Sequence, residues 1–195
     1  MRRRTFDIIL TAGGALLTAV LIIAGGLLMW GYSFANSNVH DQLAAQQIYF
    51  PKAGSDALKS PEVGPYLNQY AGQQLVNGKQ AQAYADHFIA VHLTEVADGR
   101  TYAQVSSAAL ADPTNTELQG QANTLFKGEA LRGLLLNAYA FWKVGQIALY
   151  AALASFVLGA VSLVLTALGF LHLRRVPETQ EVFAGHKDGL STATA

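Results

Sequence analysis

The sequence predicts an all-α membrane protein in which two transmembrane helices bracket a helical domain. Two apolar runs, residues 8–30 and 144–171, contain no Asp, Glu, Lys, Arg or His. A helix rises about 1.5 Å per residue, so either run can cross a hydrocarbon core of roughly 30 Å. Only a helix or a closed barrel satisfies its backbone hydrogen bonds there. The segment between the runs, residues 31–143, is long enough to form one compact domain.

The positive charge next to the two runs predicts the orientation. Residues 2–4 are all arginine, and the second run is followed by His172, Arg174 and Arg175. The positive-inside rule places such residues in the cytoplasm. We therefore expect residues 1–7 and 172–195 to be cytoplasmic and residues 31–143 to be extracytoplasmic.

Aromatic residues at the other ends of the runs agree with this orientation. Trp30 and Tyr32 follow the first run, while Tyr139 and Trp142 precede the second. Trp and Tyr are enriched at membrane–water interfaces, because their rings are amphipathic. These four residues are the predicted outer-interface aromatics.

The alternative to a first transmembrane helix is a cleaved signal peptide, with Ser33-Phe34-Ala35 as the cleavage site. The first apolar run is longer than a usual signal-peptide core, which favours an uncleaved anchor. The chain has no cysteine and no N-x-[ST] acceptor site between the runs, and it is rich in Ala, Gly and Gln. This composition favours a bacterial cytoplasmic membrane over the eukaryotic secretory pathway.

Turn and capping residues divide the central segment into helices. Ser37 is a candidate N-cap for a helix that stops before Pro51, or this stretch extends the first apolar helix after a weak break. Closely spaced prolines and glycines over residues 51–65 allow only short turns. Pro65 is placed to open a short helix that Gly72 ends.

Three later capping pairs predict further helices. Asn77 with Gln80 opens a helix that ends at residues 98–99, and its predicted buried face comprises Tyr84, Ala85, Phe88, Ile89, Val91 and Val96. Thr101 with Gln104 opens a helix to about residue 111, and Thr114 with Glu117 opens the last one. No proline follows until Pro177, so we expect this last helix to continue through residues 144–171, with a bend near Gly145. The tail beyond Arg175 has no apolar periodicity and is predicted to be disordered.

Small residues in the two apolar runs predict helix packing. Thr11, Ala15 and Ala19 lie four residues apart in the first run, and Ala151, Ser155 and Gly159 do so in the second. Small side chains let helix backbones approach closely in lipid. These faces join either the two transmembrane helices to each other or one of them to another membrane protein.

The sequence offers no motif for catalysis, and we predict neither an enzyme nor a cofactor or metal site. His87 and His92 lie five residues apart, which separates them by roughly 140° around a helix and prevents both from binding one ion. We expect His92 to be partly buried and hydrogen-bonded. Ser106 and Ser107 have no nucleophile-elbow turn around them, and the glycine pairs lie inside an apolar run, where they cannot form phosphate loops.

The remaining function classes follow from charge and composition. The formal net charge is zero and no basic stripe is present, so nucleic-acid binding is not expected. The absence of acidic and basic residues within the runs argues against a pump or transporter, although an oligomeric channel subunit stays open. The main expectation is an accessory or scaffold subunit that binds another membrane protein or a second copy. The alternative is an extracytoplasmic ligand-binding or sensory module with a pocket lined by aromatic residues, namely Tyr49, Phe50, Tyr66, Tyr70, Tyr84 and Phe88.

Overall fold

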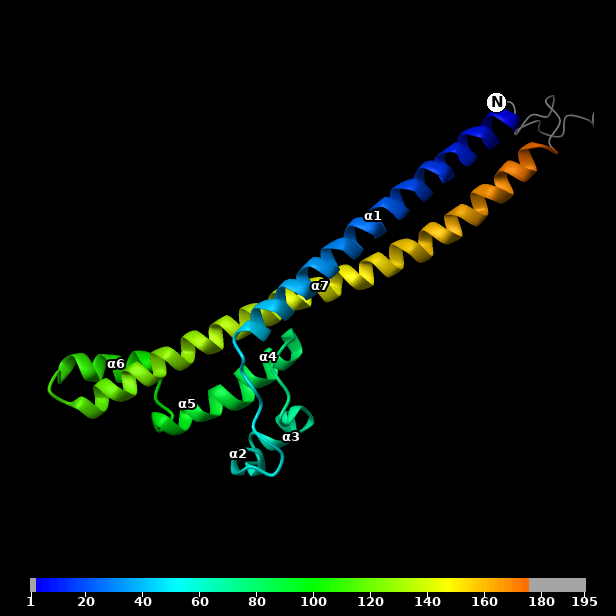
Figure 1. Cartoon of the computed structure of the whole chain (residues 1–195). Helices are drawn as coiled ribbons and strands as arrows, with labels where there is room; N and C mark the ends of the chain where they lie inside the picture. The colour runs from blue at the N-terminus through cyan, green and yellow to red at the C-terminus, as the bar shows by residue number, and fades with distance from the viewer. Residues whose placement is uncertain (1–2, 176–195) are drawn as a thin grey trace, which may run out of the picture. The chain divides into compact units, whose positions relative to one another are not determined.

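The structure is a computed structural model, and it describes residues 3–175. The described residues form helices and one isolated antiparallel bridge between Tyr49 and Gln74, with no longer strand among them. The helices follow in the order α1 (Arg3–Ala45), α2 (Asp56–Lys59), α3 (Gly64–Leu67), η1 (Asn68–Tyr70), α4 (Gly78–Tyr84), η2 (Ala85–Ile89), α5 (Ala90–Val96), α6 (Tyr102–Ala111) and α7 (Thr116–Leu173). Figure 1 labels most of them. The expected all-α fold is confirmed, and the tail predicted to be disordered lies outside the described residues.

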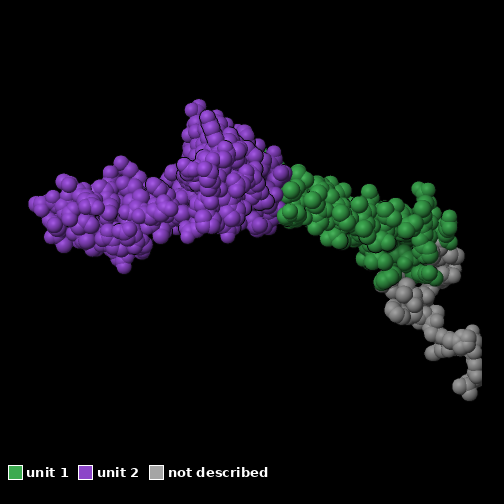
Figure 2. Space-filling model, turned by 90° about the horizontal axis from the view of Figure 1, so that it is seen from below, with its two compact units in different colours: residues 1–30, 149–195 green, residues 31–148 purple. Residues whose placement is uncertain are grey.

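Two of these helices are long and apolar enough to cross a membrane, judged by length and composition. They are α1 and α7, which contain the two apolar runs of the sequence. The chain divides into two compact units (Figure 2). Unit 1 comprises residues 1–30 and 149–195, and unit 2 comprises residues 31–148. Both long helices therefore contribute to both units.

Unit 1 is an antiparallel pair of helical segments that lie side by side (Figure 1). From one contact to the next, the residue numbers rise along α1 and fall along α7. Thr11 lies next to Gly169, Thr18 next to Ser162 and Gly25 next to Phe156. Large apolar side chains of both helices point away from the pair; examples between 61% and 69% exposed are Ile9, Leu16, Leu27, Val157 and Leu165. The outer surface of unit 1 is therefore apolar.

Unit 2 has a conventional apolar core. Its most deeply buried side chains come from five different elements or connections of the chain and include Leu43, Leu67, Leu75, Val105, Leu125 and Leu135. α6 folds back along the first part of α7, and the α4–α5 helix lies beside α7 further along (Figure 1). Short helices α2 and α3 close the core with Leu58 and Leu67.

The ends of the unit 2 helices follow most of the predicted capping residues. Asn77 accepts a hydrogen bond from the Gln80 N–H, and Thr101 with Gln104 forms a complete capping box. Two details differ from the prediction. The Gln80 side chain accepts from the Val76 N–H instead of from Asn77, and α7 is capped by Asn115, which accepts from the Leu118 N–H.

The predicted break at Ser37 is wrong. α1 is continuous through this residue to Ala45, so the stretch extends the first apolar helix, as the alternative interpretation expected, but without a weak break. The chain leaves the helix with Gln47 at a φ of 53°, in the left-handed region that ends many helices. Pro65 lies in the first turn of α3, and Gly72 follows η1 with a φ of 71°, so the predicted short helix between them is confirmed.

The continuity of α7 through the second apolar run is confirmed, and the bend expected near Gly145 stays a prediction. Two glycines of α7, Gly128 and Gly145, allow close approach of neighbouring helices in unit 2. A Cβ on Gly145 would lie 3.0 Å from the Ala35 Cβ, and one on Gly128 would lie 2.4 Å from a methyl group of Leu93. Their cost in helix propensity is therefore offset by tight packing against neighbouring helices.

The helix that begins after Asn77 contains a π-helical turn that the sequence did not predict. Within η2 the backbone bonds reach five residues back, and the Ala90 N–H donates to the Ala85 carbonyl. Residues four apart in an α-helix drift by about 40° per step, because one turn takes about 3.6 residues. The π turn offsets this drift and buries one line of residues, namely Ala81, Ala85, Ile89, Leu93 and Ala97. The predicted face was shifted: Tyr84, Phe88, Val91 and Val96 are only half-buried.

Candidate functional site

The seam between the two helices of unit 1 consists of small residues and hydroxyl groups. Thr11, Thr18 and Thr166 are among the few polar residues that are buried in the described chain, with exposures of 5–7%. A Cβ on Gly14 would lie 2.6 Å from the Thr166 hydroxyl, and one on Gly25 would lie 2.8 Å from the Phe156 ring. Glycine at these positions is thus what lets the helices approach.

Hydrogen bonds join the helices across this seam. The Thr18 hydroxyl lies 2.8 Å from the Ser162 hydroxyl and 2.8 Å from the Gly14 carbonyl oxygen. Ser162 donates to the same carbonyl at 3.2 Å. The Thr166 hydroxyl is buried and has no hydrogen-bond partner among the described residues. Hydrogen bonds of this kind between the side chains of two helices stabilise helix pairs in lipid, because no water is present there to replace them.

The predicted packing faces coincide only partly with the seam. Thr11 and Gly159 are buried there, Ala15, Ala151 and Ser155 are half-buried, and Ala19 is exposed. The α1 positions that contact α7 alternate in steps of three and four, at Thr11, Gly14, Thr18, Leu21 and Gly25. A steady four-residue step drifts around the helix, whereas alternation of three and four keeps a seam facing its partner.

One acidic residue next to the first apolar run was missed by the sequence analysis. Asp7 is only 17% exposed in its side chain, and its Oδ2 atom lies 4.0 Å from Nε2 of His172. The same end of unit 1 carries Arg3, Arg4, Arg174 and Arg175. Its position in the sequence is a signal that could have identified it: Asp7 lies four residues before Thr11 and therefore on the same face of the helix. All acidic and basic residues that the structure describes in unit 1 thus lie at one end.

The predicted outer-interface aromatics fall into different surroundings. Trp30 in unit 1 is 69% exposed, whereas Trp142 in unit 2 packs against the core and lies so close to Gly78 that a Cβ there would be 2.4 Å from the Trp142 Cβ. Tyr139 stacks beside Trp142 with ring centroids 6.2 Å apart, and Tyr32 is half-buried. Trp142 therefore contributes to folding of unit 2, and the interfacial role of the four residues stays a prediction.

The two histidines of the α4–α5 helix have surroundings opposite to those expected. The His87 ring stacks on Tyr66 at 3.5 Å between centroids, with an angle of 1° between the planes. The side chain of His92, which was expected to be partly buried and hydrogen-bonded, is 65% exposed and lies 4.0 Å from Glu95. No group of three or more metal-binding side chains gathers anywhere in residues 3–175.

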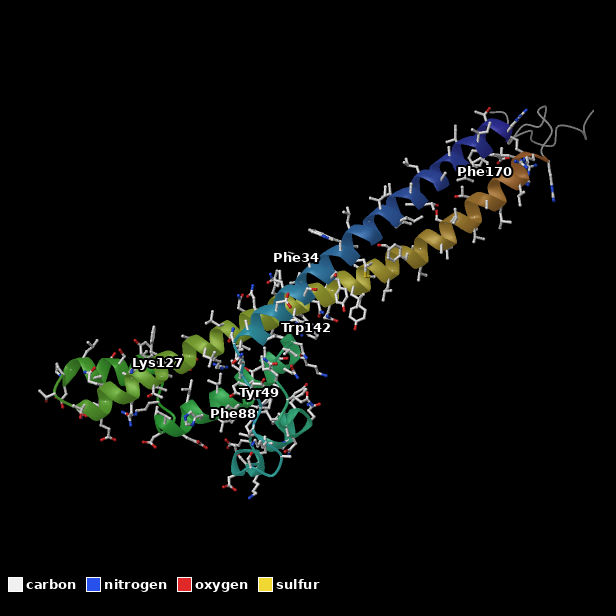
Figure 3. The ribbon with its side chains drawn as sticks, in the orientation of Figure 1. Phe34, Tyr49, Phe88, Lys127, Trp142 and Phe170 are labelled. Atoms are coloured by element: carbon white, nitrogen blue, oxygen red, sulfur yellow. The ribbon has the colours of Figure 1, made fainter. Side chains whose placement is uncertain are left out.

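Unit 2 carries an open groove between the α4–α5 helix and α7. It has a volume of about 320 Å³ and opens to solvent. Its walls come from α4, η2 and α5 on one side and α7 on the other, and the lining residues are Tyr84, Phe88, Ile89, His92, Leu93, Thr124, Lys127, Gly128 and Leu131. Figure 3 shows Phe88 and Lys127 on the two sides. Volumes of this size are at the lower end of the range for small-molecule sites.

Of the six aromatic residues expected to line a pocket, the structure brings Tyr84 and Phe88 to this groove. Phe50 is buried and packs against Tyr70 and Tyr84 with ring centroids 5.1 and 5.3 Å apart, so these rings fill the core. Tyr49 is exposed on the bridge to Gln74. Burial raises the pKa of the Tyr84 phenol above its ordinary value.

The α7 wall of the groove could not be recognised from the sequence. Thr124, Lys127 and Leu131 lie three and four residues apart on α7, which indicates a common helix face. Their partner wall depends on the π turn, which carries no sequence signal that we can name. No family model matches this chain, and no curated protein or solved structure matches it either.

Proposed function

We propose that the chain is an integral protein of a bacterial cytoplasmic membrane, with both ends in the cytoplasm and unit 2 on the extracytoplasmic side. The observation that carries this proposal is the surface of unit 1. Its large apolar side chains are exposed, while Thr11, Thr18 and Thr166 are buried at the helix–helix seam. Such a surface is stable against hydrocarbon and unfavourable in water.

The charged end of unit 1 supports the proposed orientation. Arg3 and Arg4 on α1 lie at the same end as Arg174 and Arg175 after α7. Between these groups and the other end of unit 1, the described chain carries no acidic or basic residue on either helix apart from Asp7 and His172. Clusters of arginine next to apolar helices are typical of cytoplasmic ends.

The orientation is tested by labelling single cysteines, because the natural chain has none. Cysteine at Ser37 or Ala111 should react with an impermeant maleimide added to intact cells, and cysteine at Ser191 should react only after permeabilisation. Ser37 and Ala111 are both exposed, so their reactivity reports the side of the membrane. Labelling at Ser191 without labelling at Ala111 would reverse the orientation.

We further propose that the protein is a non-enzymatic accessory or scaffold subunit that binds another membrane protein or a second copy of itself. The glycines of the internal seam are already in contact with the opposite helix. A second set of small residues remains exposed on α1 in unit 1, and Ala12, Ala19 and Gly26 recur every seven residues. Small residues in such a repeat allow another helix to approach closely in lipid.

Neighbouring glycines provide a matched test of this subunit role. Gly26 has no atom within 4 Å of its Cβ position, whereas Gly25 faces Phe156. Gly26→Leu should therefore abolish co-purification of a stoichiometric partner and leave the internal helix pair intact. If Gly26→Leu and Ala19→Leu both keep every partner at equal membrane abundance, the exposed small face contacts only lipid.

The second candidate function is a ligand-binding module. The groove between the α4–α5 helix and α7 favours it, because an apolar concave site with a few polar groups is the usual form of a small-molecule site. A small molecule retained after extraction and identified by mass spectrometry would support it. Loss of that molecule in a variant with a filled groove would assign it to this site.

A further inference from the structure

The groove of unit 2 has walls suited to an alkyl chain. Phe88, Ile89, Leu93 and Leu131 line it together with the Tyr84 ring. The rings of Tyr84 and Phe88 contact each other with centroids 4.8 Å apart, so they form one continuous aromatic surface. These walls offer an alkyl chain apolar contact along their length, and they offer few partners to a polar molecule.

Glycine and the π turn determine the depth of the groove. Gly128 lies on the α7 wall, where a Cβ would be 2.4 Å from a Leu93 methyl group. The absence of a side chain at residue 128 thus lets α5 and α7 approach at the base. The π turn carries Phe88 and Ile89 on the opposite wall. π turns are found often at functional sites, because they change the direction of side chains within a helix.

The groove is lined by basic side chains and by no carboxylate. Lys127 and His92 are the basic lining residues. Glu95 lies 4.0 Å from His92, and Glu129 lies 3.5 Å from Arg132. Asp86 also pairs with Arg132, at 3.5 Å. Lys127 has no ion pair among the described residues, so its charge is available to a ligand at the mouth of an apolar groove.

We infer that this groove binds a single-chain aliphatic carboxylate, with the alkyl chain between α5 and α7 and the carboxylate next to Lys127. One uncompensated ammonium group matches one negative charge. The volume of about 320 Å³ suits one chain rather than the two chains of a phospholipid. The inference rests on the second candidate function and names its ligand class.

Chain length is the first test of the buried alkyl chain. Each buried methylene contributes about 0.8 kcal/mol, which is roughly a fourfold change in Kd. We therefore expect affinity to rise about fourfold for each added methylene until the chain outgrows the groove. An affinity that does not change along the series from octanoate to dodecanoate would overturn the placement of the chain.

The experiment uses the full chain in phosphatidylcholine nanodiscs, because detergent would compete for an apolar groove. The probe is dodecanoic acid that carries a photoreactive diazirine on its chain. We expect labelling of the lining residues in 84–93 and 124–131, read by mass spectrometry, with unlabelled dodecanoate as competitor. Labelling confined to residues 8–30 and 149–171 would show partition into lipid only and would overturn the proposal.

Four variants distinguish the contribution of the Lys127 charge from that of the apolar groove. Thr124→Phe, at an exposed lining position, should fill the groove and reduce labelling by tenfold or more. Lys127→Gln should weaken competition by about threefold, as expected for an exposed ion pair, and Lys127→Arg should restore it. The matched control Lys52→Gln removes an exposed lysine elsewhere in unit 2 and should have no effect. Equal labelling of Thr124→Phe and the natural chain would overturn the proposal.

Competitors with other headgroups distinguish this proposal from the function on which it rests. Dodecanol and dodecyltrimethylammonium should compete less well than dodecanoate. If dodecanol competes equally well, the carboxylate assignment fails while a ligand-binding groove stands. If no amphiphile labels the groove, the ligand-binding function fails as well. Crosslinks from the groove to a second copy, in place of the probe, would assign it to self-association and overturn the proposal.

Discussion

In unit 2 the largest fully buried side chains are mostly leucines, such as Leu67, Leu75 and Leu135, whereas in unit 1 the buried positions are threonines, glycines and Ala152. The two units have helices in common, so the difference does not come from secondary structure. Along α7, Leu135 is 1% exposed in unit 2 and Leu163 is 54% exposed in unit 1. The same residue type in the same helix therefore has opposite surroundings.

The reason lies in what surrounds each unit. Water drives leucine into the core of unit 2, because burial of its side chain removes apolar surface from water. If unit 1 is surrounded by lipid as we propose, leucine gains nothing by leaving the surface, and close backbone contact with hydrogen bonds between hydroxyl groups holds the helices together. Apolar composition alone thus does not determine which residues are buried.

The largest effect is expected from a comparison of two leucines of α7. Leu135→Ala should lower the free energy of unfolding of unit 2 by about 2–5 kcal/mol, because it leaves a cavity in the core. Leu163→Ala should change stability by less than about 1 kcal/mol, because its side chain is exposed. Thermal unfolding of the full chain in nanodiscs, followed by circular dichroism, measures both. Equal losses would show that the two units are stabilised in the same way.

The next prediction compares adjacent glycines in unit 1. Gly25→Leu should separate the two helices and cost about 1–3 kcal/mol, because its side chain would collide with the Phe156 ring. Gly26→Leu, the matched control, faces open space and should not affect the pair. Crosslinking between cysteines placed at Thr18 and Ser162 reports the contact. Full crosslinking in the Gly25 variant would contradict the glycine-based seam.

A smaller effect on stability is expected when His87 and His92 of unit 2 are compared. His87→Ala should destabilise unit 2 by about 1 kcal/mol through loss of the stacked contact with Tyr66. His92→Ala should change stability by less than about 0.5 kcal/mol, because the side chain is exposed. Thermal unfolding again measures the difference. A larger loss for His92→Ala than for His87→Ala would agree instead with the expectation drawn from the sequence, in which His92 is partly buried and hydrogen-bonded.

The smallest effect concerns pH. Burial raises the pKa of Tyr84 in the folded protein above the value of about 10 in the unfolded chain. Below pH 10 both states keep the proton and the contribution to stability is complete. Above pH 10 the unfolded state loses the proton first, so stability falls until the pH passes the folded pKa. Tyr84→Phe should show a shallower decline between pH 9 and 11 in melting temperature, and an identical decline would contradict the burial effect.

The sequence by itself determined the helical class, the two apolar helices and the positions of several caps. These properties depend on local signals: long runs without acidic or basic residues at α1 and α7, and capping residues such as Thr101 with Gln104. It also indicated that α7 continues without a break, because no proline interrupts it. Each of these signals acts over a few residues, so no knowledge of distant contacts is needed.

Only the tertiary structure decided which faces are buried and where a groove forms. The seam of unit 1 runs through Gly14 and Thr18 and leaves Ala19 exposed, because the register is determined by the opposite helix. The π turn at residues 85–89 moves Leu93 into the core and brings Phe88 to the groove, opposite Lys127. Burial and cavity shape depend on contacts between residues far apart in the chain, and no local pattern specifies them.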